Sequence, residues 1–183
     1  MSEFVSQSEI ENKLEYILSS PSVEGEVKMI VRRPTIEGRE VLTEGELTFE
    51  DGLKGDTWKL RNSSKTKNDG PLLDAQLTII NSRLIDAISK SMDDWPLAGD
   101  QLYVDFDLSR ENIPAGTLLK IGKSIVEVSA TPHTGCGKFK ERFGSEALKF
   151  INSERGRFLN LRGINAKIIQ EGIIATGDRV LKI

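Results

Sequence analysis

The sequence predicts a mainly β domain with a few short helices, closed or partly closed into a barrel. Short apolar and β-branched runs recur along the chain, turn residues rich in glycine separate many of them, and helical patterns are few. Strands and helices do not alternate regularly, so a doubly wound sheet is not expected. The 183 residues fit one domain, which we place at 22–183 behind an N-terminal helix within 1–21.

The first half of the chain is expected to hold that helix, a strand pair and a strand–helix unit. Apolar residues recur at helical spacing up to Pro21, which ends the pattern. Strands are expected over 25–33, 40–49 and 77–80. Asn81 or Ser82 then caps a helix that runs to about Ser91.

The second half reads as further strands around one helical segment. Strands are expected over 102–106, 117–121, 124–129, 165–170 and 179–183. Gly122-Lys123 suits a two-residue hairpin turn, because glycine tolerates positive φ. Phe139, Phe143 and Ala147 predict a helix that Gly144 breaks in two.

Charge and composition exclude several classes of function. The net charge is −3, but residues 132–167 carry +5 and the remainder −8. An acidic chain with one basic segment favours a local anionic ligand, and the pI of 5.4 argues against a nucleic-acid partner. No apolar run is long enough for a membrane span and no secretory signal is visible, so a cytoplasmic protein without a membrane partner is expected.

The most informative segment holds the only cysteine and the only histidine, Cys136 and His133. A helix beginning near Gly137 would place Cys136 at its N-terminus, beside several cations, and both features favour a thiolate that attacks or binds metal. Gly135 and Gly137 would leave the sulfur accessible, and His133 could orient or deprotonate it. The alternatives are a buried, inert cysteine and a histidine that only ends a strand.

Candidate anion-binding residues surround this segment. Arg157 and Arg162 could clamp a phosphate because guanidinium binds it in two-pronged geometry, and Asn165 could line the same pocket. Lys138 belongs to the basic cluster, though a solvated helix face is the alternative for it. Of the three Gly-Asp pairs, Asp56 is the one we expect to face a ligand, against an ordinary turn.

Several short motifs occur in an order that resembles the MOSC domain, named for the C-terminal domain of molybdenum cofactor sulfurase. They surround the single cysteine and are Gly52-Leu53-Lys54-Gly55-Asp56, Leu97-Ala98-Gly99-Asp100, Ile113-Pro114-Ala115-Gly116-Thr117, Arg162-Gly163-Ile164-Asn165-Ala166 and Gly177-Asp178. The resemblance covers nearly everything from Ser22 onward. Several relatives carry an arginine and a proline just before the cysteine, whereas this chain has Pro132-His133-Thr134-Gly135, so Arg162 or Lys138 would have to replace that arginine.

The resemblance implies a β-barrel and a cysteine, here Cys136, that holds a persulfide or ligates molybdenum of the anionic pterin cofactor, molybdopterin. It implies a sulfur carrier or cofactor-binding protein serving metal–sulfur or cofactor sulfuration, with a cysteine desulfurase or a molybdoenzyme as partner. A reductase of N-hydroxylated compounds is the first alternative, and a non-catalytic binding module with a buried cysteine is the second. The chain is too short for the pyridoxal-phosphate domain of the sulfurase, so any pyridoxal phosphate would belong to a partner.

Overall fold

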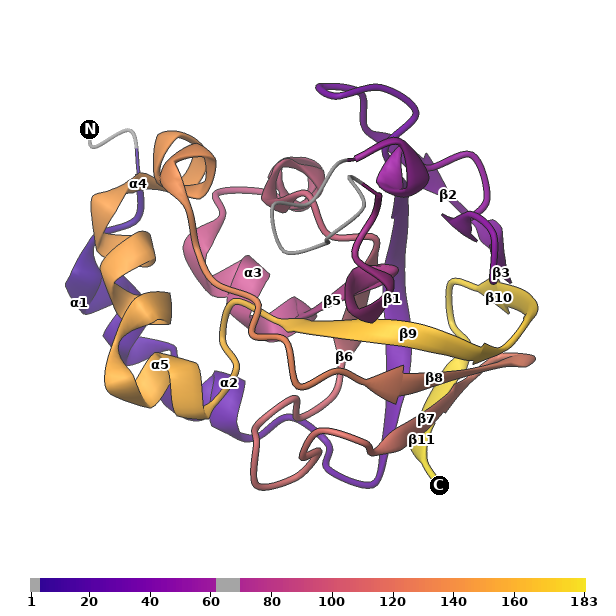
Figure 1. Ribbon diagram of the computed structural model, residues 1–183. Coiled ribbons are helices and arrows are strands. Elements are labelled where there is room, and N and C mark those ends of the chain that lie inside the picture. The colour runs from indigo at the N-terminus through magenta and orange to yellow at the C-terminus, as the bar shows by residue number, and fades with distance from the viewer. Residues whose placement is uncertain (1–3, 62–69) are drawn as a thin grey trace.

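The computed structural model describes residues 4–61 and 70–183. Within these ranges seven strands close into a barrel in the order β11-β7-β8-β9-β5-β6-β1, and β1 pairs with β11 to complete the circle (Figure 1). The barrel strands are β1 (Glu24–Arg32), β5 (Leu77–Asn81), β6 (Leu102–Asp105), β7 (Leu118–Ile121), β8 (Ser124–Val128), β9 (Ile164–Gln170) and β11 (Arg179–Lys182). The predicted mainly β fold with a closed barrel is therefore confirmed.

Strand β1 closes the barrel because it is long enough to pair with three neighbours. Its first residues pair with β11, its middle pairs with β6 across an irregularity between Val27 and Met29, and its end pairs with β2 (Glu40–Leu42). The register shift bends the strand and increases its twist, as closure requires. The only parallel pair among the described strands joins β5 to β6.

A smaller sheet and short helices flank the barrel. The sheet has the order β10-β3-β4, formed by β3 (Glu44–Thr48), β4 (Gly52–Leu53) and β10 (Gly172–Ala175). The helices are α1 (Gln7–Asn12), α2 (Leu14–Leu18), α3 (Ser82–Ile88), α4 (Gly137–Asn152) and α5 (Glu154–Phe158), with 3₁₀ turns η1 (Trp58–Leu60), η2 (Leu73–Ala75) and η3 (Met92–Ala98). Figure 1 shows α1, α2, α4 and α5 together on one side of the barrel.

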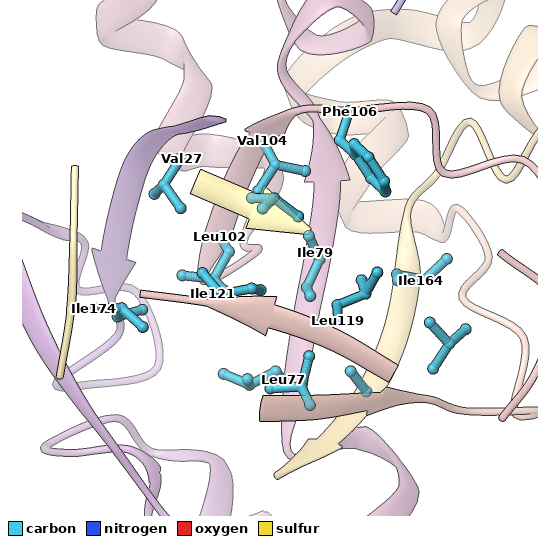
Figure 2. Close-up of a cluster of buried hydrophobic side chains, with 14 of the residues drawn as sticks. Val27, Leu77, Ile79, Leu102, Val104, Phe106, Leu119, Ile121, Ile164 and Ile174 are labelled. Carbon is cyan, nitrogen blue, oxygen red and sulfur yellow. The ribbon is translucent and has the colours of Figure 1, made fainter. Parts of the chain in front are cut away.

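Two clusters of buried hydrophobic side chains form the core of the molecule. One lies inside the barrel and includes Val27, Ile79, Leu102 and Val104 (Figure 2). The other packs the helices onto the outside of β1, β5 and β6, with Tyr103 and Phe139 among its members. Burying an aliphatic side chain of this size contributes about 1.5–3 kcal/mol. The helical layer is thus fixed to the barrel, and with it the loops that precede α4.

Several element predictions need correction. The expected strand over 40–49 is two strands separated at Thr43, because β2 pairs with β1 and β3 pairs with β10. Strand β10 lies where the sequence predicts no strand. Asn81 caps α3 as predicted, but the helix ends at Ile88. Gly144 interrupts α4 at φ 90°, as predicted, and Gly122 forms the β7–β8 turn at φ 55°.

The described helices include none whose length and apolar character would suit a membrane crossing.

Candidate functional site

Cys136 lies between the barrel and the helical layer. The chain leaves β8 at Val128 and reaches Cys136 directly before α4, where the residue is exposed. The sequence prediction that a helix starts at Gly137 is confirmed. The alternative of a buried cysteine is wrong, because the side chain is open to solvent.

The two glycines beside Cys136 have different roles. A Cβ at Gly137 would meet no atom within 4 Å, so this side of the sulfur is open. A Cβ at Gly135 would lie 2.7 Å from the side-chain ends of Leu148 and Ile151. The Gly135 backbone also exchanges two hydrogen bonds with the Asn152 amide, at 3.1 and 3.2 Å. Gly135 therefore anchors the segment to α4, and only Gly137 leaves room for an approaching molecule.

Cys136 lines a cavity of about 410 Å³ that is strongly basic. Among the described residues, six cationic side chains line it and no acidic side chain does. They are Arg33, Arg39, Arg61, Lys138, Arg142 and Arg162. We call this cavity the cysteine pocket. His133 and Phe139 complete part of its wall.

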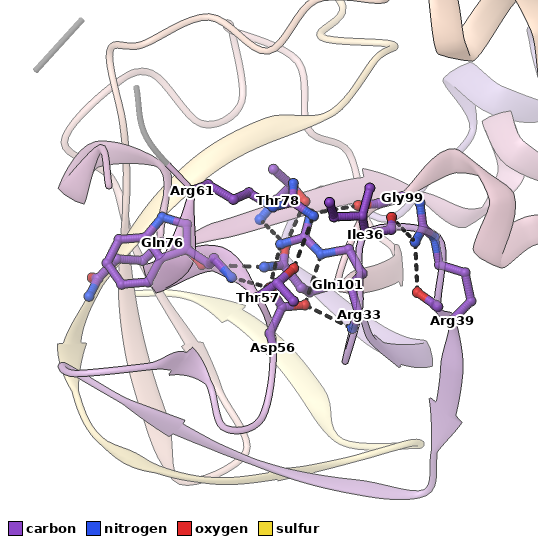
Figure 3. Close-up of polar contacts among 12 residues, drawn as sticks. Arg33, Ile36, Arg39, Asp56, Thr57, Arg61, Gln76, Thr78, Gly99 and Gln101 are labelled. Carbon is purple, nitrogen blue, oxygen red and sulfur yellow. Dashed lines mark hydrogen bonds and ion pairs between the residues drawn. The ribbon is translucent and has the colours of Figure 1, made fainter. Parts of the chain in front are cut away.

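Arg33 is held in place by Asp56. The carboxylate of Asp56 accepts bonds from Nε and Nη2 of Arg33 at 2.8 and 2.7 Å, and from the backbone N–H groups of Arg33 and Trp58 (Figure 3). The Asp56 side chain is fully buried. It is bonded to Arg33 rather than directed at a ligand, so the expectation that Asp56 faces the ligand is wrong. Its role is to position an arginine that lines the pocket.

Arg39 and Arg61 form no ion pair with any acidic side chain in the described ranges. Arg39 donates to backbone carbonyls, among them that of Pro96 at 3.1 Å, and Arg61 donates to the Thr57 hydroxyl. Burial, together with the charges of Arg142 and Arg33, lowers the pKa of Arg39. Burial and the charge of Arg33 lower the pKa of Arg61. Glu37 and Asp56 offset these effects only in part, so a bound anion would stabilise both cations.

A second buried aspartate, Asp100, holds Arg162. Nη1 of Arg162 donates to Oδ2 of Asp100 at 2.7 Å, and its guanidinium lies over the Phe139 ring at 5.0 Å. Nδ1 of His133 lies 3.5 Å from Oδ1 of Asp100. These two atoms and Nε of Arg162 are buried, and none has a hydrogen-bond partner in the part of the chain that the structure describes. The floor of the pocket is therefore a polar cluster whose bonding is incomplete.

The protonation of this cluster follows from its burial. Burial, then the charges of Arg162 and Arg33, hold the pKa of His133 well below its usual value, so the imidazole is neutral at pH 7. Burial raises the pKa of Asp100, against the opposing effect of Arg162. A neutral imidazole can accept or pass a proton, whereas an imidazolium cannot accept one.

The rim of the pocket carries the remaining cations. Glu37 accepts from Nζ of Lys138 at 3.2 Å and from Nη2 of Arg142 at 2.9 Å. Glu37 is largely exposed, and the bond from Lys138 lowers its pKa. Such an exposed pair contributes little to stability. An incoming anion can compete with Glu37 for both cations.

The structure brings some of the predicted site residues together and places others elsewhere. His133, Cys136, Lys138 and Arg162 line the cysteine pocket together. Asn165 lines a neighbouring cavity and donates to the Thr131 carbonyl at 3.0 Å. Arg157 lines a third hollow, away from Cys136.

Arg142 lies in the basic cluster expected beside Cys136, but the sequence does not predict Arg33, Arg39 and Arg61 as pocket residues. These three come from the half of the chain in which acidic residues dominate, so no local charge excess marks them. Arg33 stands directly after β1, and barrel closure brings that strand end toward α4. The double arginine at Arg32-Arg33 beside a proline was the one available signal.

The donors present fit an anionic cofactor better than a free metal ion. The described residues contain no group of three His, Cys, Asp or Glu that could hold a metal. A metal bound here would need other ligands of its own besides the Cys136 sulfur. The unpartnered Nε of Arg162 and the unpaired Arg39 and Arg61 fit the phosphate of an organic cofactor.

Similar structures have been solved for bacterial proteins. The YuaD protein from Bacillus subtilis has a TM-score of 0.65 at 13% identity, over 86% of this chain and 94% of that one. YiiM from Geobacillus stearothermophilus has a TM-score of 0.59 at 15% identity, over 87% and 75% of the two chains. YiiM from Escherichia coli has a TM-score of 0.56 at 17% identity, over 86% and 69%.

These likenesses show the shared fold, and they fit the MOSC-like barrel that the sequence predicts. No protein-family model matches the chain, and no curated protein matches its sequence. Membership of the MOSC family therefore stays a prediction.

Proposed function

We propose that this chain is a MOSC-type protein that binds the molybdenum cofactor, with Cys136 either holding a persulfide sulfur or ligating molybdenum. It would serve the sulfuration of the cofactor or of metal–sulfur centres. One observation carries the proposal: over residues 4–61 and 70–183, an exposed thiol shares its cavity with six cationic side chains and no acidic one. The MOSC-like fold supports the same assignment.

The residues of the cysteine pocket would have different roles in binding the cofactor. Arg39 and Arg61 would bind the phosphate of the cofactor, since neither is paired with an acid in the described part of the chain. Arg33 and Arg162, fixed by Asp56 and Asp100, would add positive charge on the same ligand. When bound, the cofactor would supply a redox-active metal within reach of the cysteine.

As a sulfur carrier, Cys136 would act as a nucleophile. Its thiolate would attack the outer sulfur of a persulfide on a partner such as a cysteine desulfurase. The new S–S bond forms on Cys136 as the old one breaks, and the partner leaves as a thiolate. Electrons and charge balance without an added oxidant. The neighbouring arginines would stabilise the persulfide anion.

Native mass spectrometry of protein expressed in a molybdopterin-producing host tests this function. We expect a bound pterin, an added sulfur atom on Cys136, or both. Cys136→Ser should lose the sulfur adduct, and Arg61→Gln should lose pterin occupancy while remaining folded. Arg179→Gln, which removes one positive charge at an exposed residue outside the pocket lining, is the matched control. Wild-type protein with neither adduct after incubation with a desulfurase and cysteine would refute the proposal.

A second function, reduction of N-hydroxylated compounds, is favoured by one observation. His133 lines a further cavity of about 310 Å³ as well as the cysteine pocket, which leaves space for a substrate next to that pocket. Turnover with an artificial electron donor would distinguish a reductase from a carrier. Unchanged turnover in Cys136→Ser would reject a role for the sulfur as metal ligand.

A further inference from the structure

A second cavity lies next to the cysteine pocket, and His133 lines both. It holds about 310 Å³ and is bounded by the β6–β7 connection, by residues 128–133 and by the start of β9. His133 stands at one end and Arg110, an exposed residue, also lines the cavity. We call this space the side cavity.

Arg110 connects the side cavity with a third hollow. That hollow is lined by Arg110, Arg155, Arg157, Glu154 and Phe158. The Phe158 ring is 51% exposed and offers an apolar face beside the guanidinium groups. Three spaces thus follow one another: the cysteine pocket, the side cavity beyond His133, and the hollow beyond Arg110.

The arginines of this hollow share a property with those of the cysteine pocket. Most arginines of the described ranges pair with an acidic side chain, as Arg83 does with Asp105 and Arg179 with Glu24. Those that form no ion pair there stand in two places: Arg39 and Arg61 in the cysteine pocket, and Arg110, Arg155 and Arg157 in the hollow. Unpaired guanidinium groups that converge on a concave surface are the donor set of a phosphate or carboxylate site.

We propose that Arg110, Arg155 and Arg157 form a second anion subsite, which holds the phosphate or carboxylate end of a small organic substrate. The body of that substrate lies in the side cavity, and its reacting end reaches His133 and the cysteine pocket. The subsite therefore selects small anionic substrates over neutral ones. This inference rests on the proposed function, because it assigns the substrate class of the same site.

A small molecule fits these observations better than an acidic protein partner. Arg110 and His133 line the same cavity of about 310 Å³, a volume that suits a small molecule better than a segment of protein surface. Ser129, Thr131 and Asn165 supply polar groups along that space, while Ile113 and Val128 supply apolar walls. Ligand cavities of this size combine apolar walls with a few polar groups in this way.

Binding of phenyl phosphate to the full-length protein tests the subsite. Isothermal titration calorimetry gives the affinity, and amide NMR shifts separate residues 154–158 from residues 134–139. We expect shifts in 154–158, and weaker binding by about tenfold or more in Arg157→Gln and Arg110→Gln. Benzoate in place of phenyl phosphate distinguishes a carboxylate preference, and phenol should not bind. Arg179→Gln, an exposed arginine away from the hollow, should bind like wild type.

The two proposals fail in different ways. Shifts confined to 134–139 and sensitive to Arg61→Gln would overturn the subsite and leave the cysteine pocket as the anion site. Shifts at 154–158 in a protein that never carries pterin or sulfur would support the subsite and overturn the proposed function. Equal binding of phenol and phenyl phosphate, or binding of an acidic peptide without any response to phenyl phosphate, would overturn the subsite.

Discussion

Two buried arginine–aspartate pairs support the cysteine pocket, and they differ in how completely they are bonded. Asp56 accepts two bonds from the Arg33 guanidinium and two from backbone N–H groups. Asp100 accepts one bond from Arg162, and its Oδ1 has no hydrogen-bond partner among the described residues. Both aspartates follow a glycine in the left-handed region, so their local sequence does not explain the difference.

The difference distinguishes a carboxylate with a structural role from one that we expect to take part in ligand binding. A carboxylate with all its bonds made can only hold its partner in place. A buried oxygen without a partner costs free energy, and natural proteins keep such groups mainly where function needs them. Asp100, Arg162 and His133 are therefore the part of the pocket floor that we expect to respond to a ligand.

The largest effect is expected for Asp56→Asn. The amide cannot accept both guanidinium bonds, and the Arg33 charge, which is almost completely buried, would lose its partner. We expect the free energy of unfolding to fall by about 3–5 kcal/mol. Urea denaturation measures this change. The double variant Arg33→Met, Asp56→Leu should recover much of the loss, because it removes both charges together.

A smaller loss is expected for Asp100→Asn. The amide oxygen can still accept from Arg162, and the acid already has a raised pKa, so its charge is less favoured than that of an ordinary carboxylate. We expect a loss of about 1–3 kcal/mol in the same urea assay. A loss of unfolding free energy equal to that of Asp56→Asn would contradict the difference that we infer between the two pairs. Inorganic phosphate should bind the cysteine pocket at least as well as in wild type.

The smallest effect is a pH dependence from His133. Its native pKa is lowered, so below the ordinary value of 6.5 the unfolded chain takes up a proton that the folded chain does not. Stability is therefore full above pH 6.5 and falls as the pH is lowered, by at most about 1.4 kcal/mol for each pH unit. Thermal unfolding from pH 7.5 to 5.5 measures this fall. His133→Gln should flatten the profile, and an equally steep profile in that variant would contradict the assignment.

The sequence predicted the barrel and the basic surroundings of Cys136 because both depend on local patterns. Alternating apolar residues mark the strands, and Gly137 with the phenylalanines marks α4. The division of 40–49 into β2 and β3 depends on which distant strands pair with each, and no local pattern shows that. The same reason hid Arg33, Arg39 and Arg61, which reach the pocket only through barrel closure.

Asp56 shows the same limit at a single residue. The Gly-Asp pair was correctly noted, but a carboxylate next to a turn can face a ligand or a buried arginine. Arg33 lies 23 positions earlier in the chain, and only the fold brings the two together. Gly135 is similar: its contacts with Leu148, Ile151 and Asn152 join residues 13 to 17 positions apart, and no local pattern shows them.

Strand β1 has one more consequence. Its first residues close the barrel by pairing with β11, and this pairing is the seam of the barrel. Its last residue lies directly before Arg33. One strand therefore both closes the barrel and places a cation in the cysteine pocket. The last residues of β1 pair with β2, so fraying at that end would loosen the arginine. Amide hydrogen exchange over Ile30–Arg32 should therefore slow when an anion occupies the pocket, and exchange at the seam over Glu24–Glu26 should change less.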